Sequence, residues 1–123
     1  MRPFLAIATL VALACNDVLH PALNQPFTLE IGGRAEFPAA SLSIRFMDVL
    51  ESRCPRTDVC DDPGNARVFL EVRLRDTAQT VALNTGSPSE VIVDAFRLRL
   101  VTLTPEPPVR RQDYVVRLEV HPH

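Results

Sequence analysis

The sequence predicts an all-β protein: an antiparallel β-sandwich of immunoglobulin-like or small barrel-like form, with one disulfide-stapled loop. After residue 26, hydrophobic and polar residues alternate in several runs, which is the period of a strand with one buried and one solvated face. The breaks between the runs, "IGGR", "CDDPGN", "LNTGSPSE" and "TPEPP", carry turn-forming residues. Strand-length runs separated by such breaks are typical of sandwiches and small barrels.

The first element of the chain is a short apolar segment that follows Arg2. Residues 4–14 are apolar apart from Thr9, and this run is shorter than the roughly 20 residues of a membrane-spanning helix. It is typical of a secretory signal peptide. The run ends in "VALAC", which resembles the lipobox of bacterial lipoproteins, although Ala12 stands where that motif usually has Leu. The resemblance implies cleavage before Cys15 and attachment of lipid, including palmitate, there. A plain signal peptide with an incidental cysteine is the alternative.

The number of cysteines agrees with lipid attachment. Three cysteines in an exported chain leave one without a partner. If Cys15 carries lipid, Cys54 and Cys60 form an even pair in an oxidising compartment, where disulfides persist. We therefore expect a signal peptide over residues 1–14, a lipidated N-terminus and tether over 15–26, and one β-sandwich domain over 27–121. The expected location is the bacterial cell envelope, at the periplasmic face or the cell surface.

The charge of the chain indicates no nucleic-acid partner. The 13 basic residues, all arginine, stand against 15 acidic residues, and the net charge is −2. Removal of residues 1–14 takes away only Arg2, so 12 basic residues remain against 15 acidic ones and the charge becomes −3. A nucleic-acid-binding domain usually has a basic balance.

The expected strands are the alternating runs 27–31, 41–46, 67–75 and 114–120. The run 91–103 is ambiguous, because it begins as a continuous apolar stretch and only then alternates. We interpret it as one long strand with a bend at Asp94–Ala95. A short helix across one end of the sandwich is the alternative. Prolines at positions 105, 107 and 108 end the run in either case, because proline cannot donate to a sheet ladder.

The segment "SRCPRTDVC" contains the two remaining cysteines. Their spacing fits neither a four-ligand zinc site nor a C-x-x-C redox motif. A calcium loop of the EF-hand type fails because Pro63 and Phe69 stand where glycine and glutamate are required. We predict a disulfide between Cys54 and Cys60 that closes a surface loop between two strands, and we expect no metal and no cofactor. The acidic residues of the loop form either a solvated turn or an irregular oxygen site: Asp58, Asp61 and Asp62.

The same segment carries a resemblance to a family. "SRCPRTDVC" followed by "GNARVFLEV" resembles a family of small bacterial lipoproteins and exported proteins with an S-R-C-P…C…G-x-A core that enters a hydrophobic strand. The resemblance covers about residues 27–120, and its specific motif is confined to residues 52–66. The chain departs from the pattern at 61–63, where an aromatic residue is common before the glycine. The resemblance implies the compartment and the fold, and it brings no activity.

Catalytic motifs are missing from the sequence, and we do not expect an enzyme. No G-x-S-x-G, phosphate-binding loop, H-E-x-x-H or dinucleotide fingerprint occurs. The histidines lie in the expected tether and in the C-terminal tail. A catalytic triad would therefore need one of these segments to fold back into a cleft.

Several arginines are candidates for binding a partner. Five lie in the polar phase of three expected strands, and they would form one basic stripe if those strands were neighbours: Arg73, Arg75, Arg97, Arg99 and Arg117. Such a stripe could bind an anionic envelope polymer, lipid head groups or an acidic protein. Alternatively, the arginines pair with acidic residues of neighbouring strands on an ordinary solvated face: Glu71, Asp94 and Glu119.

These observations predict a lipid-anchored envelope protein that binds a partner without catalysis, as an adaptor module. The alternative is an inhibitor of a periplasmic or secreted hydrolase, such as lysozyme or a protease. In that case the stapled loop around Arg56 would be the inserted element, because a rigid loop loses little entropy on binding.

Overall fold

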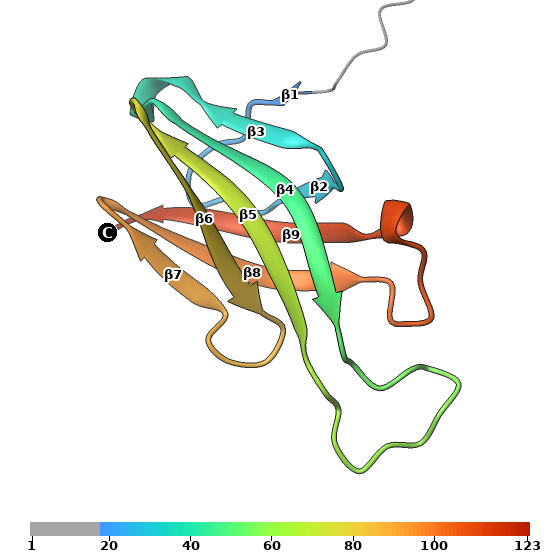
Figure 1. Ribbon diagram of the computed structural model, residues 1–123. Helices are drawn as coiled ribbons and strands as arrows, with labels where there is room; N and C mark the ends of the chain where they lie inside the picture. The colour runs from blue at the N-terminus through green and yellow to red at the C-terminus, as the bar shows by residue number, and fades with distance from the viewer. Residues whose placement is uncertain (1–17) are drawn as a thin grey trace, which may run out of the picture.

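The computed structural model describes residues 18–123, which form two β-sheets packed face to face (Figure 1). The larger sheet, here sheet A, has the strand order β1-β3-β4-β5-β6, and sheet B has the order β2-β9-β8-β7. Neighbouring strands run antiparallel except for β1 and β3, which run parallel. The predicted all-β sandwich is confirmed, and the two sheets do not close into a barrel.

The bounds of the elements are as follows. Sheet A contains β1 (Val18–Leu19), β3 (Arg34–Phe37), β4 (Leu42–Glu51), β5 (Ala66–Leu74) and β6 (Thr77–Asn84). Sheet B contains β2 (Phe27–Glu30), β7 (Glu90–Val93), β8 (Phe96–Thr104) and β9 (Val115–Pro122). Two short 3-10 turns are η1 (Pro38–Ala40) and η2 (Arg111–Asp113). Within residues 18–123, no helix is long and apolar enough to cross a membrane.

The core lies between the sheets and follows the predicted alternation. On β5, Val68, Leu70 and Val72 are buried, whereas Arg67 and Arg73, which precede and follow them, are exposed. On β9 the buried residues are again every second one: Val116, Leu118 and Val120. Burial of these side chains is the main force that holds the sheets together, at about 25 cal/mol for each Å² of apolar surface removed from water.

The run 91–103 is a hairpin, so both interpretations of it from the sequence are wrong. Strand β7 ends at Val93, β8 begins at Phe96, and these two residues face each other across a turn at Asp94–Ala95. Asp94 has φ 53°, a left-handed conformation that aspartate tolerates better than most residues. The inward-facing positions are odd-numbered before the turn, at Val93, and even-numbered after it, at Leu98. This change of phase accompanies the two-residue turn between β7 and β8.

The predicted tether is also wrong for residues 18–26, which belong to the domain. Val18 and Leu19 pair with β3, and the amide of Asn24 donates to the carbonyl of Val120 at 2.8 Å. Leu23 packs against the core. At the other end, the ordered domain continues past residue 121, because β9 runs to Pro122. The predicted signal peptide and the lipidated cysteine lie outside the described residues.

Candidate functional site

The loop that joins β4 to β5 projects from one end of the sandwich (Figure 1). We call residues 52–65 the stapled loop. Its two ends are held together where the amide and hydroxyl of Ser52 both donate to the carbonyl of Asn65, at 2.8 and 2.6 Å. Gly64 is required there, because its φ is +72° and a Cβ atom would clash with the carbonyl oxygen of Ser52. Ser52, Gly64 and Asn65 thus close the base of the loop, which we call its neck.

The predicted disulfide between Cys54 and Cys60 is present and lies within this loop, with 5.9 Å between the two Cα atoms. Backbone hydrogen bonds reinforce it: the amide of Cys54 donates to Pro63, and that of Asp58 donates to Pro55, both at 2.9 Å. Among residues 18–123, no group of three or more His, Cys, Asp and Glu side chains has an arrangement that could hold a metal ion.

Arg53 attaches the neck of the loop to sheet B. Its side chain is 12% exposed and forms a bidentate pair with Glu51, with nitrogen–oxygen distances from 2.6 to 3.1 Å. Its Nη1 donates to the carbonyl of Leu103 at 2.8 Å, and its Nη2 donates to that of Pro105 at 2.9 Å. One guanidinium thus joins the end of β4 to the end of β8 with charge-assisted bonds, which are stronger than neutral ones.

Tyr114 completes this cluster by donating its hydroxyl to Oε1 of Glu51 at 3.1 Å. Burial alone would raise the pKa of Glu51, but the hydrogen bonds and charge of Arg53 outweigh it and hold the pKa below its ordinary value. Burial and the bond to the Glu51 carboxylate raise the pKa of Tyr114. The cluster therefore holds an ionised glutamate against a neutral tyrosine at neutral pH.

Arg56 is tied back to the protein. Its amide donates to the carbonyl of Pro107, and its Nη1 donates to that of Glu106, both at 2.8 Å. These bonds fix the stapled loop to the loop that joins β8 to β9. The reactive residue of an inserted inhibitory loop should point outward, so the structure disfavours Arg56 in that role. Val59 is instead the fully exposed apolar residue, with a relative exposure of 103%.

The far side of the neck is held by asparagines. Nδ2 of Asn65 donates to Oδ1 of Asn84 at 2.9 Å, and Nδ2 of Asn84 donates to the carbonyl of Pro88 at 3.1 Å. The amide of Gly86 donates to Oδ1 of Asn65 at 3.0 Å. The neck is thus fixed both to the β8–β9 loop and to the loop that joins β6 to β7.

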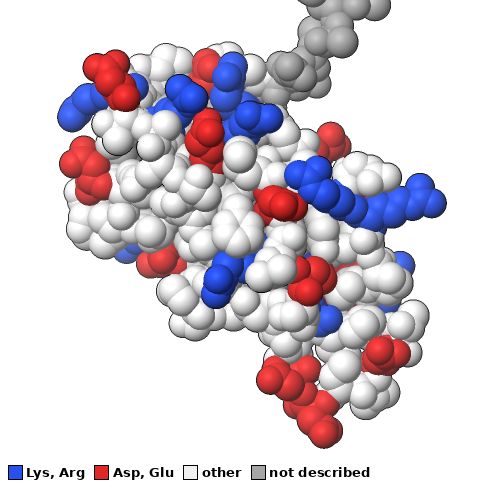
Figure 2. Space-filling view, viewed as in Figure 1, with Lys and Arg blue, Asp and Glu red and all other residues white. Residues whose placement is uncertain are grey.

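Acidic side chains gather at the end of the molecule that is formed by the stapled loop (Figure 2). Three of them belong to the loop and are exposed: Asp58, Asp61 and Asp62. Asp62 accepts a hydrogen bond from the amide of Gly64 at 2.8 Å, which is a turn-stabilising contact. The exposed part of the loop combines one bare apolar residue with a negative rim.

The five candidate arginines do not form one stripe. Arg73 lies on β5 in sheet A, and Arg75 lies in the turn that follows it with φ 55°. The other three lie in sheet B, on β8 and β9: Arg97, Arg99 and Arg117. Because the two sheets pack through their inner faces, the outward side chains of β5 and β8 point in opposite directions.

Some of these arginines instead have acidic partners. Arg99 lies opposite Glu119 on the neighbouring strand, with 3.8 Å between nitrogen and oxygen. Arg73 bonds Glu71 on its own strand at 3.0 Å. The cross-strand alternative from the sequence is therefore correct for Arg99 and Glu119.

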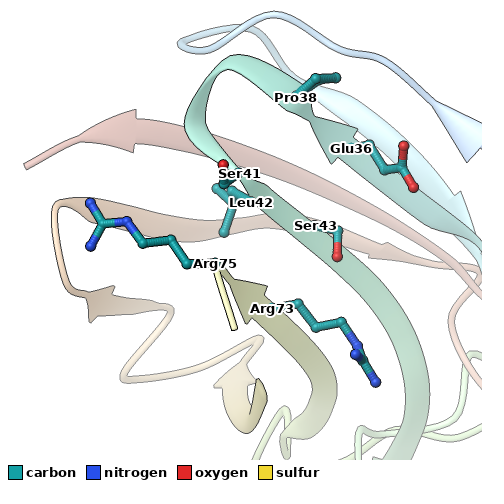
Figure 3. Close-up of a pocket in the computed structure, with 7 residues that line it drawn as sticks. All are labelled: Glu36, Pro38, Ser41, Leu42, Ser43, Arg73 and Arg75. Atoms are coloured by element: carbon teal, nitrogen blue, oxygen red, sulfur yellow. The ribbon is translucent and has the colours of Figure 1, made fainter. Parts of the chain in front are cut away.

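A shallow hollow of about 310 Å³ lies beside Arg73 and Arg75 on sheet A (Figure 3). Its lining residues come from β3, η1, β4, β5 and the turn residues Ser41 and Arg75: Glu36, Pro38, Ser41, Leu42, Ser43, Arg73 and Arg75. The two guanidinium groups point away from each other (Figure 3). Side chains that diverge in this way do not form an anion-binding fork, so the hollow is a weaker candidate than the stapled loop.

Sequence reasoning identified the disulfide but missed Glu51, Arg53 and Tyr114. Arg53 lies inside the quoted motif, yet its carbonyl partners are 50 and 52 residues away in the chain. No local spacing could reveal them. The chain matches no protein-family model, no curated protein and no solved structure. The resemblance of the cysteine motif to exported lipoproteins stays a prediction.

Proposed function

We propose that this chain is a lipid-anchored binding module of the bacterial cell envelope, which contacts an envelope protein through the stapled loop and performs no catalysis. One observation carries the proposal: the loop is fixed to the domain on two sides while it presents a bare apolar residue, Val59. A recognition loop that is already ordered loses little conformational entropy when it binds. Exposed apolar side chains with a polar rim are common at the centres of protein interfaces.

The position of the loop agrees with an anchor at the N-terminus. Strand β1, with which the described residues begin, lies at the opposite end of the molecule from the stapled loop (Figure 1). Cys15 precedes Val18 by three residues, and an extended chain of that length spans at most about 11 Å. With lipid on Cys15, β1 would stay near the membrane surface, and the stapled loop would lie at the end of the domain opposite the anchor. The disulfide supports an oxidising compartment.

Among the possible partners we favour a protein over an anionic polymer. An anionic polymer would need a single stripe of arginines, and these arginines belong to two different sheets. The exposed part of the loop carries three aspartates. Its negative charge would repel an anionic polymer and would suit a partner with a basic rim around an apolar pocket.

The test compares the capture of partners from detergent-solubilised envelopes by wild type and two matched variants. Val59→Glu should abolish capture, because it places a charge at the proposed apolar contact. Ile92→Glu changes another exposed apolar residue, at the edge of sheet B, and should leave capture intact. Arg73→Glu combined with Arg99→Glu tests the arginines and should also have no effect. Equal capture by Val59→Glu and wild type would refute the role of the loop.

The anchor has a test of its own. Cys15→Ser should abolish palmitate labelling and release the protein from membranes, while the domain keeps its fold. Persistent labelling of this variant would refute the lipobox and would leave the binding role of the loop to be judged by the capture experiment.

A hydrolase inhibitor is the second candidate, and the disulfide-closed, outward-facing segment around Val59 favours it. Inhibition of lysozyme or of proteases by the purified protein would support this function. The tethered position of Arg56 predicts that Arg56→Ala keeps most of the inhibition and that Val59→Glu loses it. The opposite order would restore Arg56 as the reactive residue.

A further inference from the structure

The free edge of sheet A is formed by β6. This strand pairs with β5 over eight residue pairs without a bulge, and it is the last strand of its sheet (Figure 1). Residues 77–80 are exposed throughout. An edge strand presents a row of backbone donors and acceptors, which makes it a template for pairing with another strand.

The other edges of the two sheets are poor templates. Strand β1 has only two residues, and β2 and β7 have four each. Both of the latter also carry a glutamate, Glu30 or Glu90. Short length and charge are devices that block pairing between edges. In contrast, β6 reads "TAQTVALN", with no charged residue and no proline over its eight residues.

We propose that β6 pairs with β6 of a second copy of this chain, antiparallel, so that the two sheets A become one continuous sheet. The two-fold axis passes through Thr80, perpendicular to the sheet. Thr80 then faces Thr80 of the second copy, and Ala78 faces Ala82 of the second copy. Such an interface uses the same surface on both partners, as in most homodimers.

Charge and size favour the second copy as the occupant. Like charges directly opposite each other destabilise strand pairs, and this pairing brings none together along the length of β6. Paired residues of neighbouring strands point to the same face of a sheet. Ala78, Thr80 and Ala82 of β6 pair with residues on the outer face of β5, so the outer face of β6 carries only small side chains. Arg73 and Glu71 bond each other at 3.0 Å, so the flanking strand is locally neutral.

Cysteine cross-linking of the full chain in isolated membranes tests the register. After mild oxidation, Thr80→Cys should give a disulfide-linked dimer on non-reducing electrophoresis, because facing Cβ atoms lie about 5 Å apart. Ala78→Cys and Ala82→Cys should give none singly, whereas the double variant Ala78→Cys/Ala82→Cys should give the dimer. Thr28→Cys, on the edge strand β2, is the matched control and should not cross-link. The wild-type chain shows how much disulfide-linked dimer the native cysteines form without an introduced cysteine.

A charge placed at the axis gives an independent measurement. Thr80→Lys brings two like charges together and should raise the dissociation constant of the dimer at least tenfold by sedimentation of the purified full chain. Thr28→Lys should leave it unchanged, and thermal unfolding checks that both variants fold. A wild type that stays monomeric overturns the proposal, as does a dimer that Thr80→Lys leaves intact. Cross-linking of Thr80→Cys to a different protein would show a foreign strand at this edge and would also overturn it.

Discussion

Replacing Arg53 by methionine removes the guanidinium that joins the stapled loop to sheet B while keeping most of the side-chain volume. The pair that it breaks is mostly out of water, since the side chains of Arg53 and Glu51 are 12% and 20% exposed. The carboxylate of Glu51 would lose its cationic partner, and the carbonyls of Leu103 and Pro105 would lose their donors. We expect the free energy of unfolding to fall by about 3 kcal/mol, the lower end of the range for a broken buried pair.

Urea denaturation with the disulfide intact measures this loss, and thermal unfolding should show a drop in Tm of about 10–20 °C for a domain of this size. The matched control is Arg73→Met. Its pair with Glu71 is 63% and 27% exposed, so its removal should cost no more than about 0.5 kcal/mol.

A double variant separates the loss of contacts from the cost of an unpaired charge. Glu51→Gln combined with Arg53→Met should be more stable than Arg53→Met alone by about 1 kcal/mol or more, because no buried carboxylate is left unpaired. The role of Arg53 would be refuted by an Arg53→Met variant that loses no more free energy of unfolding than Arg73→Met, or by a double variant that is as unstable as Arg53→Met alone.

Three further predictions concern residues in or next to the stapled loop. The pKa of Glu51 is lowered in the folded state, so its stabilising contribution is complete above the unfolded value of about 4.3 and is lost as the pH falls through the folded value. Wild type should therefore lose more stability than Glu51→Gln as the pH falls from neutral to below the unfolded value, and parallel pH profiles from urea titrations would contradict this. Replacing Cys54 and Cys60 by serine should lower the free energy of unfolding by about 2.4 kcal/mol, the loop-closure value for about seven residues; equal denaturation midpoints would contradict it. Gly64→Ala should be more destabilising than Gly32→Ala, because both positions have positive φ but only the first would also clash with backbone; similar losses in Tm would argue against the closed neck.

The alternation of the sequence predicted correctly which side of several strands is buried. Side chains point to opposite faces at successive residues, so this property is local and can be read from a run such as that around Leu70. The same rule missed β3 and β6. Strand β6 has few apolar residues, because it lies at the edge of its sheet and buries little more than Leu83 and Asn84. A strand that is mostly exposed does not need the hydrophobic pattern by which strands are recognised.

The tertiary structure also separated features that the sequence placed together. Arg73 and Arg99 have the same phase in their runs, yet they lie on different sheets. Phase indicates only whether a residue points inward or outward, whereas the sheet to which its strand belongs depends on pairing with strands far away in the chain. The tether was mispredicted for a related reason: Val18 and Leu19 pair with residues 34 and 35, and no local signal announces a two-residue strand.

The sequence by itself determined the fold class, the inward faces of several strands and the pairing of Cys54 with Cys60, because each depends on residues close together in the chain. Only the tertiary structure decided what surrounds that disulfide. Arg53 reaches the carbonyls of Leu103 and Pro105 because β4 of sheet A and β8 of sheet B end at the same end of the sandwich, where the packing of the two sheets brings them together. The same packing ties Arg56 back and leaves Val59 bare. Contacts between residues about fifty positions apart follow from the packing of two whole sheets, which no short stretch of sequence encodes.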